Sequence, residues 1–408
     1  MQNGRRTPTV LKLTAAAMLL AAVASAETPQ QAVKRFARAY FSYAPGSAVE
    51  VTPFDKTYSG PYLAFTAIRT CIKPDVKDQL GMLVDPVTNT VAVGMLFPVQ
   101  PSGPAVTADM LPELTEKLLA QRLTEFFGAR VKIPWPSAPF KLGAVIPLTA
   151  MVSTGYGAVS MPVALGVDAR HLVVGGTWPL DRDPREVRRE LLANADVQWD
   201  PVHQSASVQI VEFSDFQCPA CKRGWGSVKP LLEKAGARVR HGLVNFPLVA
   251  AHPWAFKAAV AGECVGSLWP AKLLPLKEEF YRLQETMTLE SVDPAVWGFL
   301  AQHSLDENRF RACYLKDPSI EIVLRQLDLG YRLGVTGTPT YFANGEPLPW
   351  GETEGFEKRL DAIIAAGEPE AAAEIVVSPP TPTPSPASPG APSPKPAASA
   401  GAPTPAPH

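Results

Sequence analysis

Two closely spaced cysteines carry the clearest chemistry in this sequence. The segment VEFSDFQCPACKR (Val211–Arg223) separates Cys218 from Cys221 by two residues, directly after an apolar, strand-like run. Thiols at this spacing can form a reversible redox disulfide, supply half of a metal site or make a structural crosslink. The surrounding elements decide between these chemistries.

The elements around the pair favour redox chemistry. The run ASVQIVEF (Ala206–Phe213) predicts a buried strand and the segment from Pro219 predicts a helix, so Cys218 lies where that helix starts. Free backbone N–H groups and the helix dipole stabilise an anion there, lowering a thiol pKa from about 8.5 to roughly 3.5–7.5. We therefore expect Cys218 to be the nucleophile and Cys221 to be the resolving thiol.

A second signature lies far downstream in GVTGTPTYFANG (Gly334–Gly345). Pro339 enters a short strand-like run after Thr338, which predicts a cis Thr338–Pro339 peptide bond in a loop beside the cysteines. A C-x-x-C pair in a strand–helix setting is typical of thioredoxin-like redox proteins. The two signatures together, in this order, indicate such a fold.

Two other interpretations of the cysteine pair are weaker. Structural zinc takes four ligands, but Cys264 and Cys313 are isolated from each other, and His241 and His252 lack ligand spacing. An inert structural disulfide is disfavoured by the position at a strand–helix junction. We expect neither a metal nor an organic cofactor.

The region from Val202 to about Gly367 resembles the DsbA-type thiol-disulfide oxidoreductases, which have a thioredoxin fold with an inserted helical domain. The resemblance is carried, in the family's order, by VEFSDFQCPAC, NFPLVAAHPWAFKAAVAGEC, RFRACYL and LGVTGTPTYFANG. It implies that Cys218 is the nucleophile, Cys221 the resolving thiol and Pro339 the cis-proline. It also implies that Glu212 is a buried acid that could relay the proton of Cys221.

Two departures from that family bear on the direction of electron flow. Pro219-Ala220 lacks the histidine of the strongest oxidases, and Thr338 stands where those enzymes carry valine. The main expectation is a protein that forms disulfides in secreted clients. The alternatives are a DsbC/DsbG-type isomerase or reductase, and a non-catalytic client-binding module on a thioredoxin fold.

The region before the redox motif contains a predicted internal repeat. Pairs of matching residues recur at an offset of a little over eighty residues: Val51 and Ile133, Asp85 and Asp168, Gly94 and Gly175, Pro98 and Pro179. Each copy reads as a helix followed by strands and a hairpin, although such patterns also recur by chance. A helix after Asp183, a suitable N-cap, would link the repeats to the redox region.

The end of the second copy has a family resemblance of its own. MPVALGVDARHLVVGGTWPLDRDP is similar to the end of the N-terminal dimerisation domain of DsbC- and DsbG-type disulfide isomerases. Two such modules in tandem could pair with each other in place of a dimer contact, or bind client proteins.

The first residues predict export. Arg5, Arg6 and Lys12 precede the apolar run Leu13–Val23, and Ala24–Ala26 forms a small-residue cleavage site. We expect a soluble periplasmic or otherwise extracytoplasmic protein, where disulfides persist. Five cysteines then suggest a structural Cys264–Cys313 bond, with two buried thiols or a second redox pair as the alternatives. Cys71 is left over; we expect it to be buried and inert, although an exposed thiol there could form intermolecular bonds.

Taken together, the fold class expected is an α/β thioredoxin-like domain with a helical insertion, preceded by an α+β region and followed by a disordered tail. The expected division is signal peptide 1–26, α+β repeat 27–112, α+β repeat and linker helix 113–200, DsbA-type domain 201–367 and Pro/Ala/Ser/Thr-rich tail 368–408. The near-zero net charge of −1 argues against a nucleic-acid partner. The expected partners are cysteine-containing secreted clients and a membrane redox protein; the patterns predict no oligomeric state.

Overall fold

A computed structural model of the chain describes residues 27–41, 48–54, 56–70, 77–99, 106–127, 129–136, 143–351 and 353–366. The predicted signal peptide, the Pro-rich tail and Cys71 lie outside these residues. Within them, no helix has both the length and the apolar character needed to span a membrane.

The first part of the fold is an eight-stranded antiparallel sheet with the spatial order β1-β2-β3-β4-β8-β7-β6-β5. Its strands are β1 (Ala48–Pro53), β2 (Leu63–Thr70), β3 (Lys77–Asp85), β4 (Thr90–Pro98), β5 (Val131–Lys132), β6 (Val145–Ser153), β7 (Ala158–Gly166) and β8 (His171–Pro179). The two expected hairpins are present as β3–β4 and β7–β8. Their outer partners β2 and β6 were not predicted from the sequence.

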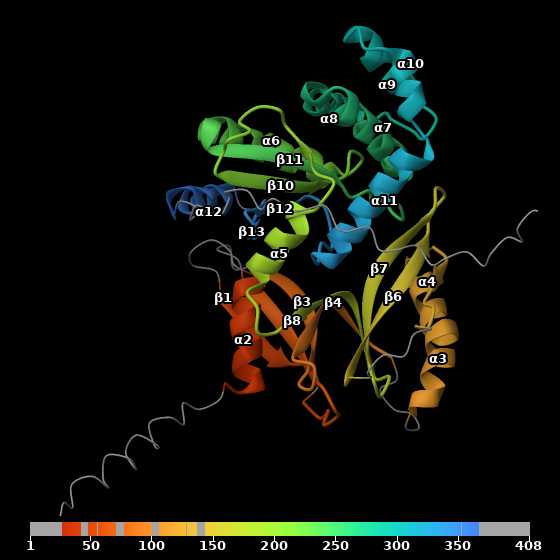
Figure 1. The fold of residues 1–408 in the computed structure, drawn as a ribbon, viewed down its shortest axis with the longest axis vertical. Coiled ribbons are helices and arrows are strands. Elements are labelled where there is room, and N and C mark those ends of the chain that lie inside the picture. The colour runs from red at the N-terminus through yellow and green to blue at the C-terminus, as the bar shows by residue number, and fades with distance from the viewer. Residues whose placement is uncertain are drawn as a thin grey trace, which may run out of the picture. The chain divides into compact units, whose positions relative to one another are not determined.

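Each half of this sheet carries its own helix (Figure 1). Helix α2 (Pro29–Tyr40) starts at Thr28, whose hydroxyl accepts a hydrogen bond from the backbone of Gln31, and buries Phe36 against the β1–β4 half. Residues 111–127 form a continuous helix with a π-helical middle, comprising α3 (Leu111–Glu113), the π segment Leu114–Leu119 and α4 (Ala120–Phe127). Its apolar side packs on the β6–β8 half.

The two halves meet at β4 and β8, where Gly94 lies directly opposite Gly175. A Cβ atom on Gly94 would lie 2.0 Å from the carbonyl oxygen of Val174, and one on Gly175 would lie 2.0 Å from that of Val93. The backbones therefore approach at a distance that only glycine permits. The two predicted repeats share one continuous sheet.

Helix α5 (Pro184–Ala193) follows the sheet and begins at Asp183, whose carboxylate accepts a hydrogen bond from the backbone of Arg185. This helix carries the buried Arg188, whose guanidinium lies over the ring of Tyr40 at 4.3 Å and that of Phe342 at 5.3 Å. Arg188 therefore contacts helix α2 through Tyr40. It also contacts, through Phe342, a strand of the five-stranded sheet described next.

The second sheet has the order β13-β12-β10-β11-β9, with β10 and β11 parallel and the other pairs antiparallel. Its strands are β9 (Gln198–Trp199), β10 (Val208–Ser214), β11 (Val239–Asn245), β12 (Thr340–Ala343) and β13 (Glu346–Leu348). Helices α6 (Pro219–Ala235) and α12 (Thr353–Ala366) pack on one face, and α7 (Ala255–Leu268) and α11 (Asp317–Arg332) on the other.

The helical insertion lies between β11 and β12, as expected from the sequence. It comprises α7, α8 (Leu273–Leu283), α9 (Val292–Gln302), α10 (Glu307–Cys313) and α11. A disulfide joins Cys264 of α7 to Cys313 of α10 across 49 residues of sequence. A crosslink over such a loop restricts the unfolded chain and stabilises the insertion.

Candidate redox site

The two central cysteines lie where strand β10 passes into helix α6. Cys218 is the N-cap of α6, Pro219 is its first residue, and the backbone N–H of Cys221 donates to the Cys218 carbonyl oxygen at 3.0 Å. Both are free thiols; Cys218 is 6% exposed, whereas Cys221 is fully buried. Only the Cys218 sulfur is within reach of another molecule.

The loop before β12 approaches Cys218. The Thr338–Pro339 peptide bond is cis, and the Sγ atom of Cys218 lies 3.5 Å from the Thr338 carbonyl oxygen. The pairing of β12 with β10 brings this loop to the start of α6, although 120 residues separate it from Cys218 in the sequence. The Thr338 hydroxyl is buried, makes no ordinary hydrogen bond to the described residues, and favours the anionic form of both thiols.

The two thiols differ strongly in acidity. A hydrogen bond from the Cys221 thiol, supported by the Thr338 side chain and the backbone N–H groups of Ala220 and Cys221, lowers the pKa of Cys218 to about 5. Burial raises the pKa of Cys221 well above its usual value. At neutral pH Cys218 is therefore a thiolate and Cys221 a thiol, the division that disulfide exchange requires.

A buried ion pair lies on the sheet beside α6. The Lys277 ammonium lies 2.6 Å from both carboxylate oxygens of Glu212, and the side chains of both residues are fully buried. His241 Nε2 lies 2.9 Å from the same carboxylate. Burial opposes the charge, but Lys277 and His241 hold the pKa of Glu212 down at about 2.

Helix α8 of the insertion supplies the cation of this pair. The Lys277 nitrogen lies 3.9 Å from the centre of the Trp225 ring in α6, and burial lowers the pKa of Lys277. The sequence predicted Glu212 but not Lys277 or His241. Lys277 occurs among the charges of an amphipathic helix, and no local signal distinguishes it from them.

Asp215 connects both cysteines to a histidine. Its backbone N–H donates to Cys221 Sγ at 3.5 Å, and its carbonyl oxygen accepts from the Cys218 N–H at 3.1 Å. Its buried carboxylate lies 2.6 Å from His252 Nδ1 and accepts the backbone N–H of Leu248. This contact raises the pKa of His252 despite its partial burial.

A cavity of about 530 Å³ opens next to Pro219. It is lined by Gln217, Pro219, Lys222, Arg223, His252, Trp254, Gln284, Glu285 and Met287. Helix α6, the segment before α7 and the end of α8 all contribute to it. A molecule bound in this cavity would adjoin the nucleophile.

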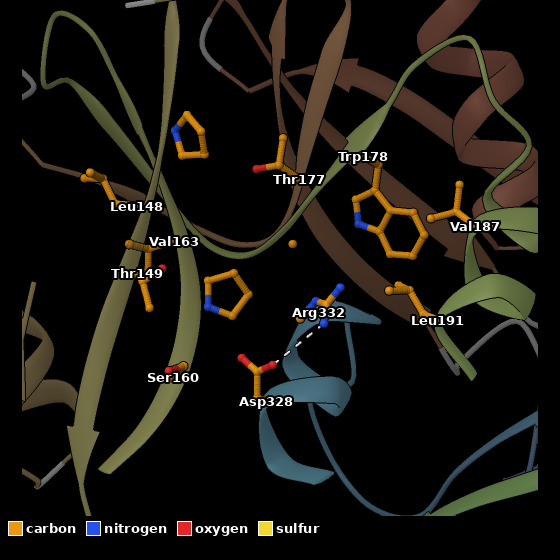
Figure 2. A pocket seen from close by; sticks show the side chains of 13 residues that line it. Leu148, Thr149, Ser160, Val163, Thr177, Trp178, Val187, Leu191, Asp328 and Arg332 are labelled. Carbon is orange, nitrogen blue, oxygen red and sulfur yellow. Dashed lines mark ion pairs between the residues drawn. The ribbon is translucent and has the colours of Figure 1, made fainter. Parts of the chain in front are cut away.

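A different cavity, of about 570 Å³, lies between strands β6–β8 and helices α5 and α11 (Figure 2). Leu148 and Thr149 line it from the sheet, and Asp328 and Arg332 line it from α11. Its lining contains no cysteine. Among the described residues, no cluster of three or more histidine, cysteine or acidic side chains could hold a metal ion.

The nucleophile at a helix start, the cis-proline loop and the sheet order point to one family, and the family comparison agrees. A family model described as thioredoxin matches residues 203–363. This segment has a thioredoxin-like fold. The matched residues 203–363 include the β10–β11 pair, α6 and the cis-proline loop.

Individual proteins similar to the chain fall into two groups. The Na(+)/H(+) antiporter NhaA 1 of Salinispora arenicola is 28% identical over 161 residues, which are 38% of this chain and 23% of the antiporter. The chain thus spans about a quarter of the length of this relative. The probable disulfide bond formation protein D of Bacillus anthracis is 26% identical over 198 residues, covering 47% of this chain and 89% of that protein.

Among solved structures, the thiol-disulfide exchange protein alpha-DsbA2 of Wolbachia pipientis is 18% identical to this chain. The match covers 45% of this chain and 99% of that one, with a TM-score of 0.37.

Proposed function

We propose that this protein is an exported thiol-disulfide oxidoreductase that forms disulfides in cysteine-containing client proteins. The observation that carries the proposal is the acidic, barely exposed Cys218 at the start of α6, held against the Thr338 carbonyl of the cis-proline loop. The similarity to a disulfide bond formation protein supports the same class of chemistry.

The reaction begins with the Cys218–Cys221 pair oxidised. A client thiolate attacks Cys218 Sγ, a client–Cys218 disulfide forms, the Cys218–Cys221 bond breaks, and Cys221 leaves and takes up a proton. A second client thiolate then attacks the client sulfur and releases Cys218 as a thiolate. Two electrons pass from the client to the protein, and a membrane redox protein would remove them.

The acidity of the two thiols supports oxidation as the direction. A disulfide becomes a stronger oxidant when its reduced form is stabilised. The low pKa of Cys218 provides this stabilisation at neutral pH, because the released thiolate is favoured. The reduced pair is therefore the preferred product of reaction with a client.

Glu212 acts differently in this proposal from the proton relay that the family resemblance implied. With a pKa of about 2 it stays ionised at neutral pH and holds Lys277 in place. Its effect on Cys221 is then electrostatic, through the Lys277 charge beside the buried thiol. Cys218, Cys221, Thr338 and Pro339 are the residues we assign to the exchange itself.

Disulfide isomerisation or reduction is the second candidate. It is favoured by Thr338, which stands where the strongest oxidases are expected to carry valine. It is also favoured by the resemblance of MPVALGVDARHLVVGGTWPLDRDP to the end of the dimerisation domain of DsbC- and DsbG-type isomerases. A non-catalytic client-binding role is the third. It predicts that the protein functions normally after Cys218→Ser.

Stoichiometric exchange with a model client tests the proposal. The oxidised protein is mixed with a reduced two-cysteine peptide, quenched with acid and analysed by mass spectrometry. We expect one peptide disulfide for each disulfide lost at Cys218–Cys221, and no exchange with Cys218→Ser. The Cys221→Ser variant, whose Cys218 is a reduced thiol, is mixed instead with a peptide whose single cysteine is already bonded to a small thiol. Its Cys218 should then form a lasting disulfide with the peptide while the small thiol leaves. Equal peptide oxidation by Cys218→Ser would overturn the proposal.

A further inference from the structure

The cavity beside Pro219 adjoins the residue that follows the nucleophile. Pro219 follows Cys218 directly and lines the cavity. When a client cysteine is bonded to Cys218, its next two residues extend at most about 7 Å from it. The part of the cavity at Pro219 is therefore within range of client side chains next to the reacting cysteine.

The charge of the cavity is mainly positive. Lys222 and Arg223 enter it from the first turns of α6, and His252 from the segment before α7. The only carboxylate in its lining, Glu285, pairs with Lys222 at 3.1 Å and is 86% exposed. Such an exposed pair is weak, so an incoming carboxylate can replace it.

Arg223 and His252 are the two basic residues of the lining that do not pair with Glu285. Arg223 is exposed and forms no ion pair with any described residue. His252 is fixed by the buried carboxylate of Asp215 at 2.6 Å, a contact that favours the protonated ring. A guanidinium binds a carboxylate through two parallel hydrogen bonds, which gives orientation as well as attraction.

The remaining lining suits a polypeptide. Pro219, Trp254 and Met287 supply apolar contact surface, and Gln217 and Gln284 are polar. The Gln284 amide N–H donates to the carbonyl oxygens of Phe216 and Cys218, which fixes α8 against the start of α6. The lining thus combines apolar contact surface with basic side chains beside the nucleophile.

We propose that this cavity is a specificity subsite that selects clients with an acidic side chain within two residues of the reacting cysteine. The inference rests on the proposed function, since it concerns the client of the same exchange. Arg223 is its main specificity residue. The simpler interpretation of Lys222 and Arg223 is a solvated helix face, which predicts no such selectivity.

The test uses two single-cysteine peptides that differ only in glutamate or lysine on both sides of the cysteine. The rate at which each peptide forms a mixed disulfide with the oxidised full-length protein is divided by its rate with hydroxyethyl disulfide, a neutral reference. An acidic neighbour raises a thiol pKa and slows its attack in solution, so any preference after correction comes from the protein. Arg223→Glu is compared with Arg130→Glu, an equal charge change at an exposed residue outside this cavity.

We expect the corrected rate for the glutamate peptide to exceed that for the lysine peptide by about fivefold at low salt. High salt should reduce this ratio. Arg223→Glu should abolish or invert it, while Arg130→Glu should leave it unchanged. Equal corrected rates in the unmodified protein, or an unchanged ratio in Arg223→Glu, would overturn the subsite. Absence of reaction with both peptides would instead contradict the proposed function.

Discussion

The ammonium nitrogen of Lys277 lies 2.6 Å from each carboxylate oxygen of Glu212, and neither side chain is exposed. The pair connects helix α8 of the insertion to strand β10 beside the redox motif. Removing either partner leaves a buried charge without its counter-ion. The insertion is therefore coupled to the redox site electrostatically as well as by packing.

Lys277→Met should lower the free energy of unfolding by about 3–5 kcal/mol, because it leaves the Glu212 carboxylate buried without its ammonium partner. The double variant with Glu212→Gln should recover part of this loss. Urea denaturation measures the free energy of unfolding of the single and the double variant. Lys234→Met, which breaks the exposed pair with Glu357, is the matched control and should change little. A loss in Lys277→Met no larger than in the control would show that the pair does not matter.

The same pair predicts a dependence of stability on pH. The pKa of Glu212 is lowered to about 2 from an unfolded value of about 4.3. Its contribution to stability is therefore present above the unfolded pKa and is lost as the pH falls toward 2. As the pH falls from the unfolded pKa to the folded pKa, the free energy of unfolding of Glu212→Gln should decrease less than that of the unmodified protein. Denaturation at each pH measures both free energies. Parallel curves of unfolding free energy against pH for the two proteins would contradict the lowered pKa of Glu212.

The Cys218 thiolate should form with a midpoint near pH 5 in the reduced protein. The ultraviolet absorbance of the thiolate, or the rate of alkylation at Cys218, measures it. Thr338→Val should raise this pKa by about one unit, because the variant removes a hydroxyl that favours the anion. A midpoint near 8.5 in the unmodified protein would exclude the proposed activation.

Asp215→Asn should lower the pKa of His252, because the neutral amide no longer favours the protonated ring. The raised pKa means that this contact stabilises the fold fully below the unfolded histidine pKa of about 6.5, and that the contribution is lost as the pH rises through the folded pKa. Titration of the His252 ring by NMR measures the shift. An identical titration curve in Asp215→Asn would refute the coupling.

The close approach of β4 and β8 predicts a cost for any side chain at its centre. Gly94→Ala and Gly175→Ala each place a Cβ atom about 2.0 Å from a backbone carbonyl oxygen, so the central strands must separate. Both should lower the melting temperature by several degrees, as for losses of about 1–3 kcal/mol. Gly155→Ala, which meets nothing within 4 Å, is the control. If all three melt alike, the tight contact is absent.

Much of the site could be predicted because its signals are local. A strand, a helix start and a proline at the first helical position are encoded within a few residues of Cys218. The Thr338–Pro339 signature is equally local, and the structure has the cis bond there. The Cys264–Cys313 bond is also present, although its prediction rested on the compartment and the cysteine count.

The electrostatic surroundings were not predictable, since they join distant segments. Lys277 is 65 residues from Glu212, and His252 is 37 residues from Asp215. Each side chain has an ordinary local setting, and only the packing of α8 and of the α7 entrance brings it to the site. The single eight-stranded sheet was missed for the same reason: strands β2 and β6 were not recognised, and the contact between β4 and β8 depends on tertiary pairing.

The reduction potential of the Cys218–Cys221 pair tests the central claim most directly. It is measured by equilibrating the full-length protein with glutathione buffers and quantifying the oxidised fraction, together with the redox state of the pair in cells. The stabilised Cys218 thiolate predicts an oxidising potential near −120 mV and a mostly oxidised pair in cells. A potential near −270 mV with a mostly reduced pair would contradict disulfide formation as the function.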